Sequence, residues 1–305
     1  MNETPSSAPP RAGIAAIVGR TNVGKSTLVN RLLGEKVSIV TDTVQTTRNV
    51  IRAILTEPRG QIVFLDTPGV HKAKGELGKN LNKMARSAAE GCDAVLLTLD
   101  ASCRPELEDD GWFRRVARMG LPCVFALNKI DLPRGHAAAY RALWEGIKAE
   151  KESEVEPVWL ETSALKGIGT DRLLDRLFEF FPEGPPLFPE DVLTDYPRKL
   201  NIADVIREKL FLRLHEELPH AVAVWVEKIE EGERKWTVQA NVYVERHSQK
   251  GIVIGNKGRL LKWVREQAER ELREMYGVRF KLELWVKVEK NWRKNFWMLK
   301  KLGYA

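Results

Sequence analysis

The sequence predicts two domains, an α/β domain with a mainly parallel sheet followed by a smaller α+β domain. Three observations support this division. In the first part of the chain, apolar β-rich runs alternate with helical patterns, then a proline-rich segment interrupts the chain, and beyond it the order of elements changes. A chain of 305 residues is long enough to bury two separate hydrophobic cores.

The first part contains five patterns typical of buried strands. They are IAAIVG (14–19), QIVFLD (61–66), AVLLTLD (94–100), CVFALNK (123–129) and PVWLETSA (157–164). The stretches between and after them have helical spacing, as in KSTLVNRLLG, KNLNKMARSAAEG, DDGWFRRVARMG and DRLLDRLFEFF. Near-continuous apolar strands joined by crossover helices indicate a mainly parallel sheet with helices on both faces. We expect this domain to span residues 13–181, after a disordered leader at residues 1–12.

The second part begins after PEGPPLFPEDVLTDYP, whose five prolines predict a linker at residues 182–199. A helical pattern follows, then the strand patterns AVAVWVEKI and KWTVQANVYVER on either side of an EEGE turn. A glycine loop, a helix to about Met275 and the strand pattern FKLELWVKV complete the chain. The order α-β-β-α-α-β is that of a type II KH fold, which we predict for residues 200–305.

The net charge of +7 is unevenly distributed. Residues 1–185 contain 25 Lys and Arg against 24 Asp and Glu, whereas residues 246–305 contain 16 against 6. This asymmetry predicts a polyanionic partner for the C-terminal domain, with a merely solvated basic face as the alternative.

The sequence shows no pattern of a secretory signal or of a membrane span, and this, together with its use of cysteine, favours a cytoplasmic protein. No apolar run reaches the roughly 18–20 residues that cross a bilayer, and the polar, proline-rich N-terminus lacks the apolar segment of a secretory signal. The three cysteines have no metal-like spacing, which fits a reducing compartment.

The segment GRTNVGKS (19–26) matches the pattern G-x-x-x-x-G-K-[S/T], between a predicted strand and a predicted helix. Glycines in such a loop let backbone N–H groups converge on nucleotide phosphates at the positive end of a helix. Lys25 would reach the β- and γ-phosphates, and the Ser26 hydroxyl would bind Mg²⁺. The predicted nucleotide-binding residues here are Gly19, Arg20, Thr21, Asn22, Val23, Gly24, Lys25, Ser26 and Thr27.

Two further motifs end predicted strands on the same edge of the sheet, where ligands of open α/β sheets bind. They are DTPG, comprising Asp66, Thr67, Pro68 and Gly69, and NKID, which contains Asn128, Lys129 and Asp131. Asp66 would hold the Mg²⁺ shell, and the Gly69 N–H would touch the γ-phosphate. Asp131 could accept two hydrogen bonds from guanine that adenine cannot donate, which would give a discrimination of about 10⁴-fold or more. The motifs together predict a guanine-nucleotide site.

These motifs resemble those of the translation-factor-like GTPases, in particular the bacterial Era GTPase family with a C-terminal KH domain. The resemblance extends to QTTRN (45–49), TSA (162–164), KNWR (290–293) and LGY (302–304). It implies that a threonine of QTTRN completes the Mg²⁺ shell. We assign Thr47 to this role, with Thr46 as the less favoured alternative. It also implies that Ser163 and Ala164 contact guanine through their backbone.

The predicted hydrolysis machinery lacks the glutamine that positions the attacking water in Ras-like GTPases, because Val70 follows Gly69. His71 is a weaker candidate for that role. Related GTPases with an apolar residue here carry an asparagine in the first glycine loop that helps to bind K⁺, and Asn22 occupies that position. We therefore predict a slow GTPase with GTP or GDP, Mg²⁺ and candidate K⁺ as cofactors. Its predicted catalytic residues are Lys25, Asn22, Thr47 and Gly69.

The second glycine loop, GNKG (255–258), lacks the lysine and hydroxyl pair of a P-loop. KH domains use a GXXG loop to clamp about four nucleotides of single-stranded RNA. The predicted RNA-binding residues are Gly255, Asn256, Lys257, Gly258, Arg259 and Lys262. In the tail, Trp292, Phe296 and Leu299 have helical spacing and are expected to pack in the core, while the neighbouring lysines and arginines contact RNA or a membrane surface.

The family resemblance implies a GTP-dependent switch that binds the 3′ region of small-subunit ribosomal RNA and assists assembly of the small ribosomal subunit. We expect a monomer with peripheral contact to anionic lipid on the inner face of the cell membrane. The alternative function is a GTP-regulated adaptor whose KH-like domain binds protein or a membrane surface.

Overall fold

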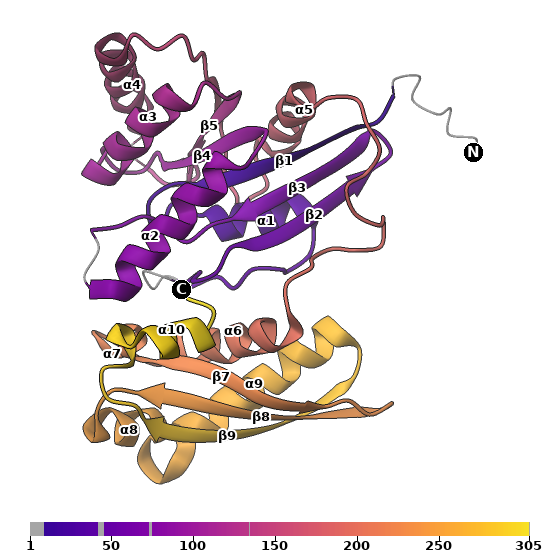
Figure 1. Ribbon diagram of the computed structural model, residues 1–305, viewed down its shortest axis with the longest axis vertical. Helices are drawn as coiled ribbons and strands as arrows, with labels where there is room; N and C mark the ends of the chain where they lie inside the picture. Colours follow the sequence, from indigo (N-terminus) through magenta and orange to yellow (C-terminus); the bar gives the residue numbers. More distant parts are fainter. Residues whose placement is uncertain (1–8, 42–45, 73–74, 134, 305) are drawn as a thin grey trace. The chain divides into compact units, whose positions relative to one another are not determined.

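The computed structural model describes residues 9–41, 46–72, 75–133 and 135–304 (Figure 1). The chain forms two compact units, which we call unit 1 and unit 2. Unit 1 comprises Met1–Ser38, Thr47–Lys72 and Leu81–Asp195, and unit 2 comprises Ile39–Thr46, Ala73–Asn80 and Tyr196–Ala305.

Unit 1 is built, among its described residues, on a six-stranded sheet with the order β2-β3-β1-β4-β5-β6 (Figure 1). β2 runs antiparallel to β3, and every other neighbouring pair is parallel. The strands are β1 (Arg11–Val18), β2 (Ile51–Glu57), β3 (Gly60–Asp66), β4 (Ala94–Asp100), β5 (Cys123–Asn128) and β6 (Val158–Glu161).

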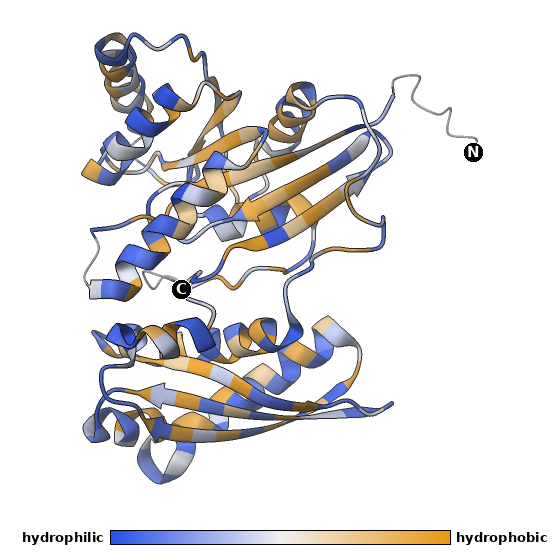
Figure 2. Cartoon of the chain, viewed as in Figure 1, coloured by the Kyte–Doolittle hydropathy of each residue, from blue (hydrophilic) through white to orange (hydrophobic). Residues whose placement is uncertain are grey.

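Successive residues of a strand point to opposite sides of the sheet. Because the strand residues are apolar on both sides, helices cover both faces of this sheet. Ala15 and Ile17 of β1 pack in one core with α1 (Lys25–Leu33) and α5 (Thr170–Phe180). Ala16 and Val18 pack in the opposite core, and the helices there are α2 (Gly75–Glu90), α3 (Leu107–Met119) and α4 (Ala137–Lys151). Figure 2 shows the apolar colour concentrated in the strands, while polar and apolar residues alternate along α2. The predicted doubly covered parallel sheet is confirmed.

Three local features of unit 1 differ from the sequence analysis. The edge strand β2 and the helix α4 were not among the predicted patterns. β1 begins at Arg11, inside the predicted leader, of which residues 1–8 lie outside the described part of the chain. Arg11 is held because it pairs with Gly60 of β3 and its guanidinium donates to the Phe181 carbonyl at 2.8 Å.

The proline-rich segment predicted as a linker packs along unit 1 up to Asp195. The buried Gln61 side chain binds this segment from β3. Its Oε1 accepts from the backbone N–H groups of Leu187 (2.7 Å) and Phe188 (2.8 Å), and its Nε2 donates to the Phe188 carbonyl at 2.9 Å. The N–H of Ile54 donates to the Leu193 carbonyl at 2.9 Å. This part of the predicted linker is therefore fastened to the sheet.

Unit 2 contains the predicted element order α-β-β-α-α-β, with a one-turn helix added before the first strand and a short helix added after the last strand (Figure 1). β7 and β8 are antiparallel, and β8 and β9 are parallel, in a sheet with the order β7-β8-β9. Its elements are α6 (Arg198–Phe211), the one-turn helix α7 (Leu218–Ala221), β7 (Ala223–Glu230), β8 (Lys235–Val244), α8 (His247–Ile254), α9 (Arg259–Tyr276), β9 (Arg279–Val288) and α10 (Phe296–Lys301). In the described residues, no helix is both long and apolar enough to cross a membrane.

The core of unit 2 forms where α6, α8 and α9 bury apolar side chains against the sheet. Ile206 of α6, Val253 of α8, Val264 and Ala268 of α9 and Val242 of β8 are all fully buried in one cluster.

The predicted packing of the C-terminal aromatic residues is only partly correct. Trp292 and Leu299 are buried, and the Trp292 Nε1 donates to the Ala221 carbonyl at 2.9 Å. Phe296, however, is 58% exposed. The predicted spacing needed one continuous helix, but a 3-10 turn at Trp292–Lys294 and an extended Asn295 separate Trp292 from α10. Phe296 therefore does not share the buried face of Trp292.

Candidate functional site

The loop between β1 and α1 lies at a point where the strand order of the sheet reverses, because β1 has β3 on one side and β4 on the other. Open α/β sheets bind ligands at such points, beyond the carboxyl ends of the strands. Gly24 has a φ of +97°, and a Cβ at this position would lie 2.4 Å from the Asn128 Nδ2. Only glycine fits this position, and its main chain remains accessible to a ligand.

Lys25 is the first residue of α1, and its side chain turns back over the loop. The ammonium group donates to the carbonyls of Arg20 at 2.7 Å and Gly19 at 3.2 Å. Burial lowers the pKa of Lys25 to about 8, although nearby Asp66 acts in the opposite direction. The ammonium is thus held mainly by neutral groups, and the phosphates of a bound nucleotide would supply anionic partners.

Ser26, Thr47 and Asp66 bring three oxygen donors together. The Ser26 hydroxyl donates to the Asp66 Oδ2 at 2.7 Å and lies 2.9 Å from the Thr47 Oγ1. Asp66 is fully buried at the end of β3, and its Oδ1 has no hydrogen-bond partner among the described residues. Burial raises the pKa of Asp66, against the Ser26 hydrogen bond and the charge of Lys25. A hard cation such as Mg²⁺ would fit this oxygen set and the unpaired carboxylate oxygen.

The structure distinguishes the two candidate threonines. Thr47 contributes its hydroxyl to the group around Ser26, whereas the Thr46 hydroxyl lies 2.6 Å from that of Thr41. This geometry favours Thr47 as the metal ligand. Gln45, the first residue of the QTTRN motif, lies outside the described residues.

The DTPG turn packs directly on the first glycine loop. The Val70 N–H donates to the Gly19 carbonyl at 3.2 Å, and the Thr21 N–H donates to the Val70 carbonyl at 3.3 Å. A Cβ on Gly69 would lie 2.7 Å from the Thr21 Cα. A displacement of one loop would therefore disturb the other.

Asn128 joins three loops at the end of the sheet. Its Nδ2 donates to the Val23 carbonyl at 2.8 Å, and its Oδ1 accepts from the Ala164 N–H at 2.9 Å and the Thr162 hydroxyl at 3.3 Å. The first glycine loop, the NKID motif and the TSA motif are thus brought together as the sequence predicted. The Asn128 side chain therefore has a structural role, because its hydrogen bonds hold these loops together.

Asp131 and Ser163 follow β5 and β6 at the same end of the sheet. The Ser163 hydroxyl donates to the Asp131 Oδ1 at 2.5 Å, and Asp131 is exposed. Its second carboxylate oxygen could face a base. Lys129 has a φ of +66°, and its ammonium donates to the Asp100 Oδ2 at 2.6 Å.

The sequence analysis predicted Arg20 as a nucleotide-binding residue and missed the acidic group around it. Its guanidinium pairs with the buried Asp109 and with Glu106, both at 3.2 Å, at the start of α3. Burial lowers the pKa of Arg20, but the nearby Asp109, Cys103 and Glu106 together raise it above its ordinary value. These partners follow Arg20 by more than 80 positions, and no local pattern indicates the pairing.

The second glycine loop connects α8 to α9 in unit 2. Gly255 and Gly258 both have a φ of +75°, and Lys257 between them has a φ of +50°. Asn256, Lys257, Arg259 and Lys262 are exposed. A Cβ on Gly255 would meet Leu260 at 2.7 Å, whereas a Cβ on Gly258 would lie in open space.

A groove of about 690 Å³ runs from this loop across α9 to β9. Cations line it at Lys257, Lys262, Arg265 and Lys281 and outnumber two carboxylates, at Glu269 and Glu283. The strand also contributes Trp285. Trp285 is 45% exposed, so its ring is accessible. The sequence analysis missed Lys281 and Trp285, because their alternation along β9 gives no sign that this edge lies beside the loop.

Comparisons with known proteins match both units. A model described as a 50S ribosome-binding GTPase matches residues 14–129, and a KH domain model matches residues 217–293. The protein named GTPase Era from Geotalea uraniireducens is 43% identical over 300 residues, which cover 96% of this chain and 98% of the relative. The chain belongs to the Era GTPase family. GTPase Era from Carboxydothermus hydrogenoformans is 40% identical over 299 residues, covering 97% and 98% of the two chains.

Two solved Era structures resemble the chain over almost its full length. A variant of Era from Aquifex aeolicus bound to GDP and AlF₄⁻ has a TM-score of 0.88. Era in complex with MgGDPNP and nucleotides 1506–1542 of 16S ribosomal RNA has a TM-score of 0.89. Each is 36% identical, and each comparison covers 97% of this chain and 99% of the other. The predicted fold class and family are confirmed.

The depressed pKa of Lys25 predicts that GDP binding takes up a proton in alkaline solution. Phosphate raises the pKa of the ammonium in the complex, so free Lys25 is neutral above about pH 8 and bound Lys25 is charged. GDP affinity should then fall by about tenfold per pH unit above this value, until the pKa of the complex is reached.

Calorimetry of GDP binding at about pH 9, in buffers of different ionisation enthalpy, directly measures the number of protons taken up on binding. Lys25→Arg is the matched control, because its guanidinium stays charged and should show no uptake at this position. Equal uptake by the two proteins would contradict the assignment.

Proposed function

We propose that this chain is a GTP-hydrolysing switch that binds single-stranded ribosomal RNA and assists assembly of the small ribosomal subunit. The observation that carries the proposal is the presence of two glycine loops of different kinds in one chain. One belongs to a nucleotide site with a guanine-type motif, and the other opens onto a cationic groove. Membership of the Era family and the relative solved with 16S ribosomal RNA nucleotides support the proposal.

In the proposed nucleotide site, each loop has a distinct task. The backbone of residues 19–27 and the Lys25 ammonium hold the phosphates, and the Gly69 N–H contacts the γ-phosphate. Ser26, Thr47 and Asp66 hold Mg²⁺, which neutralises phosphate charge when bound. Asp131 accepts from guanine, while Ser163 and Ala164 present their backbone to the base. The braced position of Asn128 between these loops supports the assignment.

Hydrolysis in the proposed mechanism is slow, because the Val70 side chain can neither donate nor accept a hydrogen bond. The His71 Nδ1 lies 3.3 Å from the Gly69 carbonyl, which favours a structural role for this ring. Asn22 is exposed in the left-handed conformation with a φ of +61°. We assign Asn22 to a site that would hold K⁺, whose charge would stabilise the transferring phosphoryl group.

In the proposed RNA site, the backbone of Gly255–Gly258 lies against the sugar-phosphate chain, and Lys257 and Lys262 contact phosphates. Arg259, Arg265 and Lys281 extend the cationic surface. The accessible ring of Trp285 provides a stacking surface for an unpaired base. We expect a cytoplasmic location, where the ribosomal RNA is found, and a monomeric chain.

An adaptor that binds an anionic membrane is the second candidate function. It is favoured by Phe296 and Trp297, which are 58% and 73% exposed, and by the Lys300 ammonium 5.9 Å from the Trp297 ring. Aromatic rings beside cations suit a membrane interface.

Asp131→Asn should shift the nucleotide preference from guanine to xanthine. The amide can donate to the additional xanthine oxygen but cannot accept both guanine hydrogen bonds, so GDP affinity should fall by roughly 10²–10⁴-fold. Competition binding of GDP and XDP measures the shift, with the exposed Asp171→Asn of α5 as control. Unchanged guanine preference would refute the role of Asp131.

Replacing Na⁺ by K⁺ should raise the rate of GTP hydrolysis, and both Asn22→Ala and Asn22→Gly should remove most of the gain. Glycine tolerates the positive φ of this position, whereas alanine is strained there. Comparing the two variants therefore distinguishes the effect of losing the side-chain amide from the effect of backbone strain. Single-turnover hydrolysis in each salt provides the measurement. If Asn22→Gly keeps its K⁺ response, the amide is not the ligand.

Gly258→Asp should abolish binding of single-stranded RNA and leave GDP affinity unchanged. The substituent fits open space, and its carboxylate repels phosphate in the groove. Gly277→Asp is the matched control. It has a φ of +69° and open space as well, but lies at the opposite end of α9.

Filter binding of RNA and a fluorescent GDP titration test both variants. RNA binding that survives in Gly258→Asp, or is lost equally in Gly277→Asp, would contradict the assignment. A chain that binds anionic vesicles and no RNA would instead support the adaptor function.

A further inference from the structure

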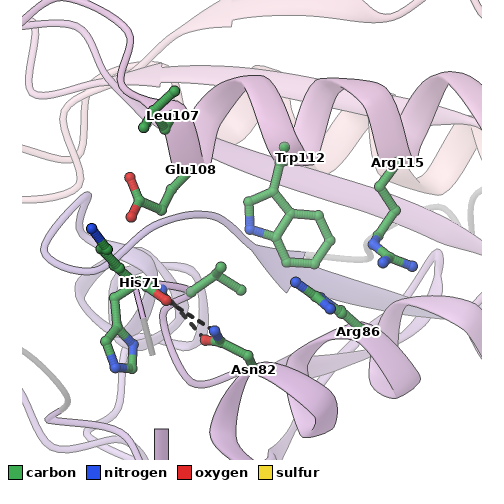
Figure 3. A pocket seen from close by; sticks show the side chains of 10 residues that line it. His71, Asn82, Arg86, Leu107, Glu108, Trp112 and Arg115 are labelled. Atoms are coloured by element: carbon green, nitrogen blue, oxygen red, sulfur yellow. Dashed lines mark hydrogen bonds between the residues drawn. The ribbon is translucent and has the colours of Figure 1, made fainter. Parts of the chain in front are cut away.

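A cavity in unit 1, of about 370 Å³, lies between the residues that follow Gly69 and the helices α2 and α3 (Figure 3). None of the residues 19–27 of the first glycine loop lines this cavity. Val70 does line it, and the Val70 main chain is also hydrogen-bonded to that loop. Arg86 comes from α2, while Leu107, Glu108, Trp112 and Arg115 come from α3. The volume is within the range of small-molecule sites.

The Trp112 indole supplies a buried hydrogen-bond donor without a partner. Trp112 is only 3% exposed, and its Nε1 has no hydrogen-bond acceptor among the described residues. Figure 3 shows this nitrogen on the side of the ring that faces His71 and Asn82. Asn82 is already engaged, because its Nδ2 donates to the His71 carbonyl at 2.9 Å. An unpaired buried N–H is costly, so an acceptor brought by a ligand would be favoured.

The charged groups of the cavity favour an anion. Lys72, Arg86 and Arg115 contribute three cations, and Glu108 contributes one carboxylate. Arg115 also pairs with Glu90 outside the lining, at 3.1 Å. Arg86 is exposed, and its guanidinium lies below the Trp112 ring in Figure 3.

The apolar part of the lining comes from Val70, Leu107 and Trp112. Leu107 is 87% exposed, so an occupant could cover it and gain hydrophobic contact. We propose that this cavity binds a small organic anion with a flat apolar body. One of its oxygens accepts from the Trp112 Nε1, its charge lies beside Arg86, and its body packs against Leu107.

This site goes beyond the proposed function, because it takes a ligand different from either nucleotide or RNA. An occupant would also hold the segment from Val70 to Lys72 against α3. Since Val70 is bonded to Gly19 and Thr21, the ligand would act on the phosphate loop through the main chain.

The test uses the full chain loaded with GDP and Mg²⁺, titrated with 2-naphthoate while the indole ¹H–¹⁵N resonances are recorded. The Trp112 resonance, assigned with Trp112→Phe or by backbone connectivity if that variant fails to fold, should shift saturably with a Kd of about 1 mM. Neutral 2-naphthamide has the same flat body and should bind at least about fivefold more weakly.

Arg86→Gln should weaken 2-naphthoate binding by about fivefold, since it removes an exposed cation from the site. Arg118→Gln is the matched control, because Arg118 is an exposed arginine of α3 outside the lining, and it should leave the Kd unchanged. The proposal is overturned if the Trp112 resonance stays still up to the solubility limit, or if only other indoles such as that of Trp285 move. Equal binding of the amide, or equal weakening by both substitutions, overturns it as well.

Discussion

The hydrogen bonds of the Asn128 side chain hold the nucleotide-binding loops of unit 1 together. The side chain is almost fully buried, donates to the Val23 carbonyl and accepts from the Ala164 N–H. Each buried group left unpaired would cost about 1–3 kcal/mol, so the three loops are held in one arrangement. That arrangement depends on the parallel register of β1, β4, β5 and β6, which places their carboxyl ends at one edge of the sheet.

The two glycine loops differ in their packing, in a way that fits the two kinds of phosphate recognition proposed for them. Gly24 is crowded, since any side chain would strike Asn128, and Lys25 behind it is buried. Gly258 has a similar backbone conformation, but open space surrounds its missing side chain. An enclosed loop suits a compact nucleotide whose groups are all contacted at once. An open loop suits a polymer that continues past the protein in both directions.

Much of the fold and of the nucleotide site could be predicted, because the informative residues lie in continuous patterns. β4 runs over Ala94–Asp100 as expected, and the motifs containing Ser26, Asp66 and Asn128 each end or follow a strand. β2 was missed because the edge strand IRAILTE mixes charged and apolar residues. The Arg20–Asp109 pair and the position of Trp285 beside the second glycine loop arise only from tertiary packing. The prediction that Phe296 is buried was wrong because a 3-10 turn and an extended residue interrupt the helical spacing.

The proline-rich segment that is bonded to unit 1 also covers part of an exposed edge of the sheet. β2 is an edge strand, and an edge strand presents unpaired N–H and C=O groups that can recruit a strand from another molecule. Here the Ile54 N–H is bonded to the Leu193 carbonyl, and the Thr194 hydroxyl donates to the Arg52 carbonyl at 2.6 Å. Prolines upstream in the same segment cannot extend a strand ladder. The segment therefore covers part of the open edge and protects the molecule against edge-to-edge aggregation.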